Sequence, residues 1–241
     1  EVISKIKIKG DERVLDIGCG DGKVTAYIAS LLPKGSVLGI DNSLDMIRFA
    51  QSRFPQSAWP NLSFLYGDAR DLHYFDEFDL VVSFATLHWI LDHRPVLEGI
   101  KRSLKPGGRL FAQFGGRGNA SEFFRIVDKE IAEGAWARYF RDFSFPYGFF
   151  APEEYKDWLD QAGLKAKRVE LMEKDMVQPD SEGLASWMES TWLPYLERIP
   201  GELRSAFISE MVESYITAHP PDRGGRIHLA MIRLEVEAEK G

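Results

Sequence analysis

The chain of 241 residues lacks several features that would place it in other classes of protein. Its only cysteine is Cys19, so no disulfide can form within the chain, which favours the reducing cytoplasm. No apolar run reaches membrane-spanning length, and the start lacks a signal-peptide pattern. No dense run of lysine and arginine occurs and the net charge is −7, which disfavours nucleic acid as a partner. We therefore expect a small-molecule partner and no membrane association.

Other absences bear on organisation. The five histidines are scattered without the spacing of metal ligands, so no metal site is expected. No internal repeat or low-complexity linker appears, which indicates a single domain over residues 1–241. The oligomeric state stays open, with a monomer favoured. Because the chain begins with Glu1 rather than Met, in what resembles a helix end, we expect a further N-terminal segment.

The first half alternates short apolar runs with helical patterns. Strands are expected at 14–17, 37–40, 62–66, 78–84 and 109–114, and helices at 23–32, 43–54 and 94–104. Apolar runs that are nearly continuous are typical of strands buried on both faces. Strands that alternate with helices over short turns predict a parallel, doubly wound α/β sheet.

The second half changes character. Residues 120–140 are expected to be helical, 143–150 form an aromatic loop, and 152–162 and 165–173 predict a helix and a strand. Some fifty helical residues precede a last strand at 227–236. We predict a Rossmann-like, mostly parallel seven-stranded sheet with an antiparallel last strand and a helical insertion before it. Residues 1–118 would be the cofactor-binding core, and 119–164 and 174–225 would cover the substrate.

The corner after the first strand reads "VLDIGCGDGKVT" and has glycines at 18, 20 and 22. The dinucleotide fingerprint would need a glycine where Lys23 stands, and the phosphate-binding P-loop pattern also fails. What remains is an acid inside the strand followed by three glycines. Such a corner lets a ligand approach the backbone at the point where the strand order of an open sheet reverses.

Two further carboxylates follow the next strands. Asp41 ends the second strand about twenty residues past the glycines, where a carboxylate can accept from both hydroxyls of a ribose. Asp68 follows the third strand in "YGDAR", where it can accept from the exocyclic amine of adenine. Together with Asp16 they would repel phosphates and favour a cationic nucleoside, which selects S-adenosylmethionine (SAM) with its sulfonium and ammonium groups.

Five blocks of this sequence resemble, in order and spacing, the core motifs of class I SAM-dependent methyltransferases. They are "VLDIGCGDG", "GIDNS", "LYGDARDL", "FDLVVSFATLHWI" and "LKPGGRLF", which lie within residues 11–114. The resemblance implies an enzyme with SAM as cofactor and S-adenosylhomocysteine as product. By the same resemblance the cofactor residues are Asp16 and Gly18 at the methionine moiety, Cys19 and Gly20 in the loop, Asp41 at the ribose, Asn42 and Met46 beside the adenosine, Asp68 and Ala69 at the adenine, and Phe84 behind the methyl-transfer site. The side chain of Cys19 is expected to be a small apolar filler. A segment before the first strand commonly folds over the cofactor in this family.

Looser motifs are similar to trans-aconitate methyltransferases and related small-molecule carboxyl O-methyltransferases. These are "FATLHWILD", "FGGRGN", the region of Trp192 and "PPDRGGR" at 220–226. This resemblance implies methylation of a carboxylate oxygen of a small organic acid.

Candidates for the acceptor site lie beyond the cofactor motifs. His88, directly after the fourth strand, could act as a base or as a donor to the substrate, or it could simply pack against Trp89. Arg117, after the fifth strand, and Arg226 could bind a substrate carboxylate, or face water. The aromatic residues Tyr147, Trp192 and Tyr195 could close an apolar pocket together with Trp89, or form core.

A carboxylate acceptor arrives as an anion and needs no general base, whereas an alcohol, amine or carbon acid would need one. The leading hypothesis is therefore a carboxyl O-methyltransferase. The alternatives are an N- or C-methyltransferase with His88 as base, and a SAM-binding protein without catalysis. A nicotinamide oxidoreductase is disfavoured by Lys23 in the glycine corner.

Overall fold

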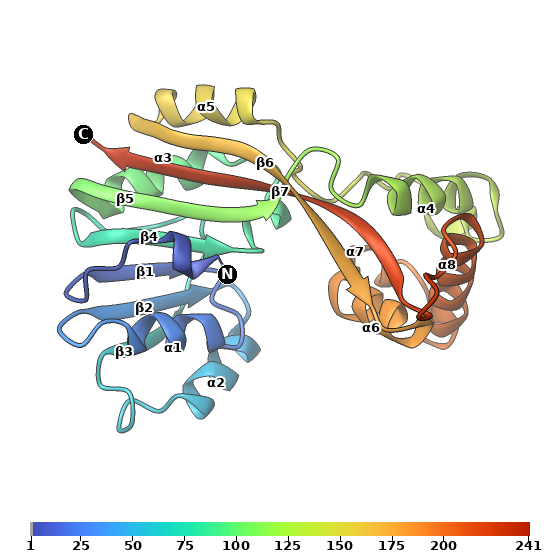
Figure 1. Cartoon of the computed structure of the whole chain (residues 1–241), viewed down its shortest axis with the longest axis horizontal. Coiled ribbons are helices and arrows are strands. Elements are labelled where there is room, and N and C mark those ends of the chain that lie inside the picture. The colour runs from blue at the N-terminus through green and yellow to red at the C-terminus, as the bar shows by residue number, and fades with distance from the viewer. Residues whose placement is uncertain (1) are drawn as a thin grey trace. The chain divides into compact units, whose positions relative to one another are not determined.

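In the computed structural model, which describes residues 2–241, seven strands form one sheet in the order β3-β2-β1-β4-β5-β7-β6 (Figure 1). The helix end expected at Glu1 lies outside the described residues. The strands are β1 (Arg13–Ile17), β2 (Ser36–Asp41), β3 (Leu62–Tyr66), β4 (Phe78–Phe84), β5 (Leu104–Gly115), β6 (Leu164–Gln178) and β7 (Ile227–Lys240). The first five pair in parallel, and β7 pairs antiparallel with β5. The predicted fold class is confirmed.

Helices cover both faces of this sheet because successive strand residues point to opposite sides. Along β1, Val14 joins the core formed with α1 (Lys23–Ser30) and α2 (Leu44–Arg53). The next residue, Leu15, joins the core formed with α3 (Arg94–Ser103) and α5 (Pro152–Gln161). The strand order reverses at β1, which has β2 on one side and β4 on the other. The carboxyl ends of β1 and β4 therefore flank the crevice where such sheets bind ligands.

The chain divides into two compact units. The first holds the chain up to Arg117, then Tyr147–Met172 and Arg233–Gly241, and the second holds Gly118–Pro146 and Glu173–Ile232. Strands β6 and β7 begin or end within the second unit, so they extend beyond the predicted strands at 165–173 and 227–236. The unit boundary divides the aromatic loop predicted at 143–150: residues 147–150, with the predicted helix 152–162, belong to the first unit. That the remaining inserted segments cover a substrate stays a prediction.

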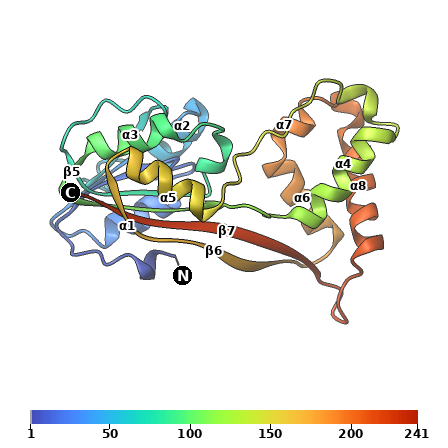
Figure 2. The same ribbon diagram turned by 90° about the horizontal axis from the view of Figure 1, so that it is seen from above.

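The second unit consists mainly of helices (Figure 2). Buried aromatic side chains such as Phe123, Trp192 and Tyr195 form its core. Its helices are α4 (Ser121–Glu133), α6 (Ser181–Thr191), α7 (Leu193–Leu196) and α8 (Arg204–Ala218). The helical pattern predicted for 120–140 ends early because the chain turns at Gly134 before a short 3₁₀ helix, η3 (Ala137–Tyr139). The apolar residues of the sequence at four-residue spacing, Leu203, Phe207, Met211 and Tyr215, predict one helical face; the last three lie in α8 and are buried, whereas Leu203 precedes α8 and is partly exposed. None of the helices in residues 2–241 is both long enough and apolar enough to cross a membrane.

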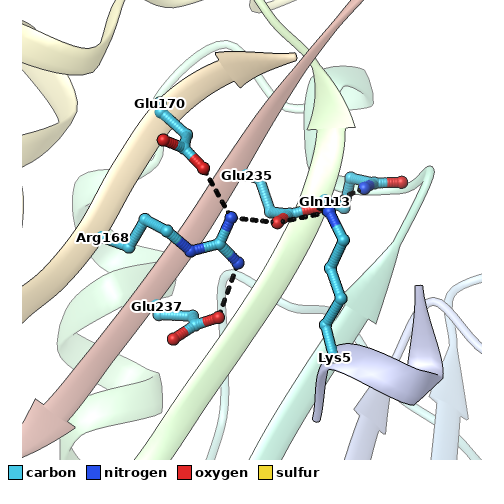
Figure 3. Close-up of polar contacts among 6 residues, drawn as sticks. All are labelled: Lys5, Gln113, Arg168, Glu170, Glu235 and Glu237. Carbon is cyan, nitrogen blue, oxygen red and sulfur yellow. Dashed lines mark hydrogen bonds and ion pairs between the residues drawn. The ribbon is translucent and has the colours of Figure 1, made fainter. Parts of the chain in front are cut away.

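A buried carboxylate links the start of the chain to the last strands. Glu235 on β7 has a fully buried side chain, and Lys5, in the 3₁₀ helix η1 (Ile3–Lys5), reaches both of its oxygens at 2.9 Å (Figure 3). Arg168 on β6 forms ion pairs with Glu235 and, at 2.6 Å, with Glu237. Gln113 on β5 donates to Glu235 at 2.6 Å. Burial raises the pKa of Glu235, but these donors outweigh it and hold the pKa below its ordinary value.

This network predicts a large loss of stability on substitution of Glu235. Glu235→Gln leaves two cations beside a neutral amide, and we expect the free energy of unfolding to fall by about 3 kcal/mol. The control Glu239→Gln breaks an exposed pair with Lys167 and should cost at most about 1 kcal/mol. Urea unfolding of both variants at pH 7 measures the difference. Equal losses would show that the buried network adds nothing over a surface pair.

Candidate active site

The corner after β1 uses its three glycines for different reasons. All have positive φ, at +76° for Gly18, +52° for Gly20 and +77° for Gly22. A Cβ on Gly18 would lie 2.1 Å from the Thr86 side chain, and one on Gly22 would lie 2.7 Å from Phe64. A Cβ on Gly20 would meet nothing within 4 Å. Packing therefore requires the outer two glycines, whereas the middle one faces open space.

Backbone hydrogen bonds join this corner to the end of β2. The amides of Gly18 and Cys19 donate to the carbonyl of Ile40 at 2.8 and 3.0 Å. Cys19 is buried against Gly39, where a Cβ would lie 2.9 Å from the Cys19 Cβ. Burial, followed by the charges of Asp16 and Asp41, raises the pKa of its thiol well above the ordinary range. Cys19 thus packs as the small filler that the sequence predicts and holds no activated thiolate.

The carboxylate of Asp41 bonds both the glycine corner and the residues that begin α2. Its Oδ2 accepts from the amide of Gly20 at 2.9 Å, and its Oδ1 accepts from the amide of Ser43 at 2.9 Å. Ser43 also caps α2 by accepting from the amide of Met46. Asn42 and Met46 are exposed on this rim, with Met46 45 % exposed. The carboxylate is therefore held rigidly by main-chain donors, and it keeps lone pairs for a further donor.

Asp68 has a partner that the sequence reasoning missed. Its oxygens accept from the guanidinium of Arg70, at 2.9 Å from Nε, and from the Arg70 amide at 2.8 Å. These bonds hold the pKa of the Asp68 carboxyl below its usual range. Its neighbour Ala69 is buried. Asp68 is thus ionised and oriented, but a base amine would share it with Arg70.

Asp16 is the buried acid of the group. Its side chain accepts from the hydroxyl of Thr25 at 2.7 Å, and Thr25 is another residue that sequence reasoning missed. Burial raises the pKa of Asp16 to about 6; Thr25 lowers it and the charge of Asp41 raises it further. A buried carboxyl with one donor and an acidic neighbour is suited to a cation.

The end of β4 is fastened to the glycine corner through Thr86. Its hydroxyl lies 3.1 Å from the carbonyl of Gly18 and 3.0 Å from that of Phe84. Phe84 is half-buried and packs against Phe111. Between them Ala85 has φ +52°, a left-handed conformation that costs a non-glycine residue energy and often occurs at functional sites. Thr86 therefore connects two predicted cofactor residues, Gly18 after β1 and Phe84 at the end of β4.

His88 lies in the 3₁₀ helix η2 (Leu87–Trp89) that follows β4. Its Nδ1 accepts from the amide of Gly115 at 3.4 Å, so in the neutral ring Nε2 carries the hydrogen. Burial, then the charge of Arg233 and that of His93, lowers the pKa of His88 to about 3. The ring is therefore neutral at physiological pH and presents a donor.

Aromatic rings surround His88. The rings of Trp89, Tyr147 and Phe149 have centroids 5.7, 6.1 and 6.1 Å from that of the imidazole. The amide of Gly148 donates to the His88 carbonyl at 2.8 Å, which fixes the aromatic loop to this rim. The structure thus brings together three predicted acceptor-site residues, His88, Trp89 and Tyr147.

Other predicted acceptor-site residues lie elsewhere. Arg117, in the first unit, is exposed and forms an ion pair with Glu154 at 2.6 Å. Arg226, in the second unit, pairs with Asp222 at 2.8 Å. Trp192 and Tyr195 are buried in the aromatic core of the second unit, with ring centroids 4.8 Å apart. Roles for these four residues in the acceptor site stay predictions.

Comparison with known proteins agrees with this geometry. The family model described as "Methyltransferase domain" matches residues 14–108. A trans-aconitate 2-methyltransferase of Deinococcus radiodurans is 32% identical over 92% of this chain and 84% of its own length. A crystal structure of a methyltransferase candidate from Bacillus halodurans C-125 superposes with a TM-score of 0.68 at 19% identity and covers 99% of this chain and 96% of its own. A phosphoethanolamine N-methyltransferase from Haemonchus contortus, solved with S-adenosylhomocysteine, has a TM-score of 0.62 at 21% identity and covers 99% of this chain and 51% of its own.

The sheet order, the glycine corner and these matches define a SAM-dependent methyltransferase. The chain belongs to the class I SAM-dependent methyltransferase family of the trans-aconitate 2-methyltransferase type, and SAM is its cofactor.

The raised pKa of Asp16 predicts how the stability of the ligand-free protein varies with pH. Because the folded state favours the protonated acid, stability should fall as the pH rises from about 4 to about 6. Asp16→Asn removes this cost and should stabilise the ligand-free protein at pH 8 by on the order of 1–3 kcal/mol, with no gain at pH 4. Asp68→Asn, whose acid has a lowered pKa, should not stabilise. Urea unfolding at both pH values measures each difference, and a loss of stability in Asp16→Asn at pH 8 would contradict it.

Proposed function

We propose that this enzyme transfers the methyl group of SAM to a carboxylate oxygen of a small organic acid. The similarity to a trans-aconitate 2-methyltransferase supports the acceptor class. The observation that carries the proposal is the state of His88, which is neutral, has its Nδ1 occupied and has a pKa of about 3. Such a ring is a poor general base at neutral pH, and a carboxylate needs none.

The residues of the first unit fit the cofactor in charge and shape. We assign the ribose to Asp41 with Asn42 and Met46 at the adenosine, and the adenine to Asp68 and Ala69. We assign the methionine moiety to the corner from Asp16 to Gly20, where the buried acid suits an ammonium and the open space at Gly20 admits a ligand. When bound, the cofactor supplies a methyl group on positively charged sulfur, already activated for displacement.

The protein's own contribution is then alignment and exclusion of water. Phe84 would lie behind the transferred methyl group, and the rings of Trp89 and Tyr147 pack against His88. The Nε2–H of His88 donates to an oxygen of the bound acid and so orients it. Holding two reactants in line in a dry site can supply roughly 7–11 kcal/mol of the barrier reduction in favourable cases.

The alternatives place other demands on the same residues. An N- or C-methyltransferase with His88 as base would need the ring to accept a proton at neutral pH, and its lowered pKa opposes that. A SAM-binding protein without catalysis would keep the corner but form no product.

Labelled methyl transfer tests the acceptor atom. We expect the protein, given methyl-labelled SAM and small di- and tricarboxylic acids, to form a product that releases its label as volatile methanol in alkali. Label that stays behind would indicate nitrogen, carbon or ether chemistry. No transfer, with SAM still bound, would support the non-catalytic alternative.

The role of His88 predicts a flat pH profile. Between pH 6 and 9 the rate of ester formation should not change with ionisation of His88, because its pKa of about 3 keeps it neutral throughout. His88→Gln, which keeps a donor, should lose less than about tenfold, whereas removal of a general base typically costs about 10²–10⁴-fold. A rate that rises with pH in the wild type, with a loss above about 100-fold in His88→Gln, would restore the base mechanism.

The glycine corner offers a matched pair of variants. Gly20→Ala places a methyl in open space and should weaken S-adenosylhomocysteine binding at least about tenfold, at a backbone cost of about 1–2 kcal/mol. Gly18→Ala collides with Thr86 and should lose more stability than Gly20→Ala. Calorimetric titration and urea unfolding separate the two effects. Wild-type affinity in Gly20→Ala would remove this corner from the cofactor site.

A further inference from the structure

Arg233, on the last strand, is a cation to which the described residues offer no hydrogen-bond or ion-pair partner. It lies on β7 directly opposite Gly115 of β5 and is half-buried. Within residues 2–241, no hydrogen bond or ion pair reaches its guanidinium. A guanidinium withdrawn from water without an anion is unfavourable, so this position favours a charged ligand.

The nearest acids on the same face of β7 are already engaged. Alternate residues of a strand share a face, so Arg233, Glu235 and Glu237 project to the same side. Figure 3 shows that Glu235 is held by Lys5, Gln113 and Arg168, and Glu237 by Arg168. Cations from η1 and β6 therefore neutralise these two acids, and neither acid pairs with Arg233.

Arg233 and His88 meet at Gly115. The amide of Gly115 donates to Nδ1 of His88, while Gly115 and Arg233 are opposed across the β5–β7 ladder. Burial lowers the pKa of His88, and the positive charge of Arg233 lowers it further. Arg233 and His88 thus flank the same glycine at the end of β5, and the guanidinium lies close enough to the imidazole for its charge to act there.

We propose that Arg233 is the residue that anchors the carboxylate of the methyl acceptor and sets the preference for acids, with His88 as the second donor. The inference rests on the proposed function. A guanidinium presents two parallel N–H donors that match a carboxylate, and such pairs are strong in a partly dry site. The arginines that the sequence suggested for this task, Arg117 and Arg226, already pair with Glu154 and Asp222.

Binding and turnover together test the proposal. Trans-aconitate is titrated into the protein saturated with S-adenosylhomocysteine, and ester formation is measured in parallel. Arg233→Met, which keeps the length of the side chain, should weaken trans-aconitate binding by about 10- to 100-fold and raise KM more than it lowers kcat. Affinity for S-adenosylhomocysteine should stay within about twofold of the wild type. Arg233→Lys, which keeps the charge but not the fork, should fall between the two.

Two further variants sharpen the comparison. Arg13→Met removes one positive charge at the start of β1, the opposite end of the strand from the rim, and should not change trans-aconitate binding. Arg117→Met tests the competing anchor. The inference is overturned if Arg233→Met binds trans-aconitate like the wild type, or if Arg117→Met alone loses binding.

The outcomes separate the inference from the proposed function. Binding that depends on Arg233 without an alkali-labile product would sustain the anchor and defeat the carboxyl transfer. An ester formed equally by wild type and Arg233→Met would sustain the carboxyl transfer and defeat the anchor. If the wild-type complex binds neither trans-aconitate nor simpler mono- and dicarboxylates, both fail. If Arg233→Met does not fold, Arg233→Lys decides, since unchanged binding there would refute a role for the fork.

Discussion

The contact between Gly18 and Thr86 joins the two halves of the proposed active site, the glycine corner after β1 and the rim that follows β4. The corner after β1 and the end of β4 approach so closely that a single Cβ on Gly18 would lie 2.1 Å from the Thr86 side chain. The Thr86 hydroxyl lies 3.1 Å from the Gly18 carbonyl across that gap. Because the strand order reverses between β1 and β4, this contact sets the distance between the cofactor corner and the acceptor rim. Alignment for methyl transfer depends on that distance.

Charge is divided across this junction. Asp16 and Asp41 lie near the carboxyl ends of β1 and β2, and Asp68 lies in the turn that follows β3. On the other side lie the neutral ring of His88, which follows β4, and the cation of Arg233 on β7. In the function proposed above, one side would hold the positively charged donor and the other the anionic acceptor. A displacement that neutralises both charges is favoured in a site shielded from water.

The sequence was sufficient for the sheet because its strands are buried on both faces, and such strands show as nearly continuous apolar runs. It also located the carboxylates at the strand ends, since β1, β2 and β3 pair in parallel and end at one edge. Partners that arise from tertiary contacts were not visible. That Arg70 folds back on Asp68, or that Gly115 donates to His88, depends on turns and on strand register rather than on residue pattern.

The environment of Arg233 is also invisible in the sequence. In a strand that alternates, a charged residue usually faces solvent, so nothing in "AMIRLEVEAE" distinguishes Arg233 from an ordinary exposed position. Its significance comes from what its neighbours do. Glu235 is the natural partner two residues away, but Lys5 and Arg168 reach it from η1 and β6. The network that ties the start of the chain to the sheet therefore leaves Arg233 without an acid partner among residues 2–241, as the proposed carboxylate anchor requires.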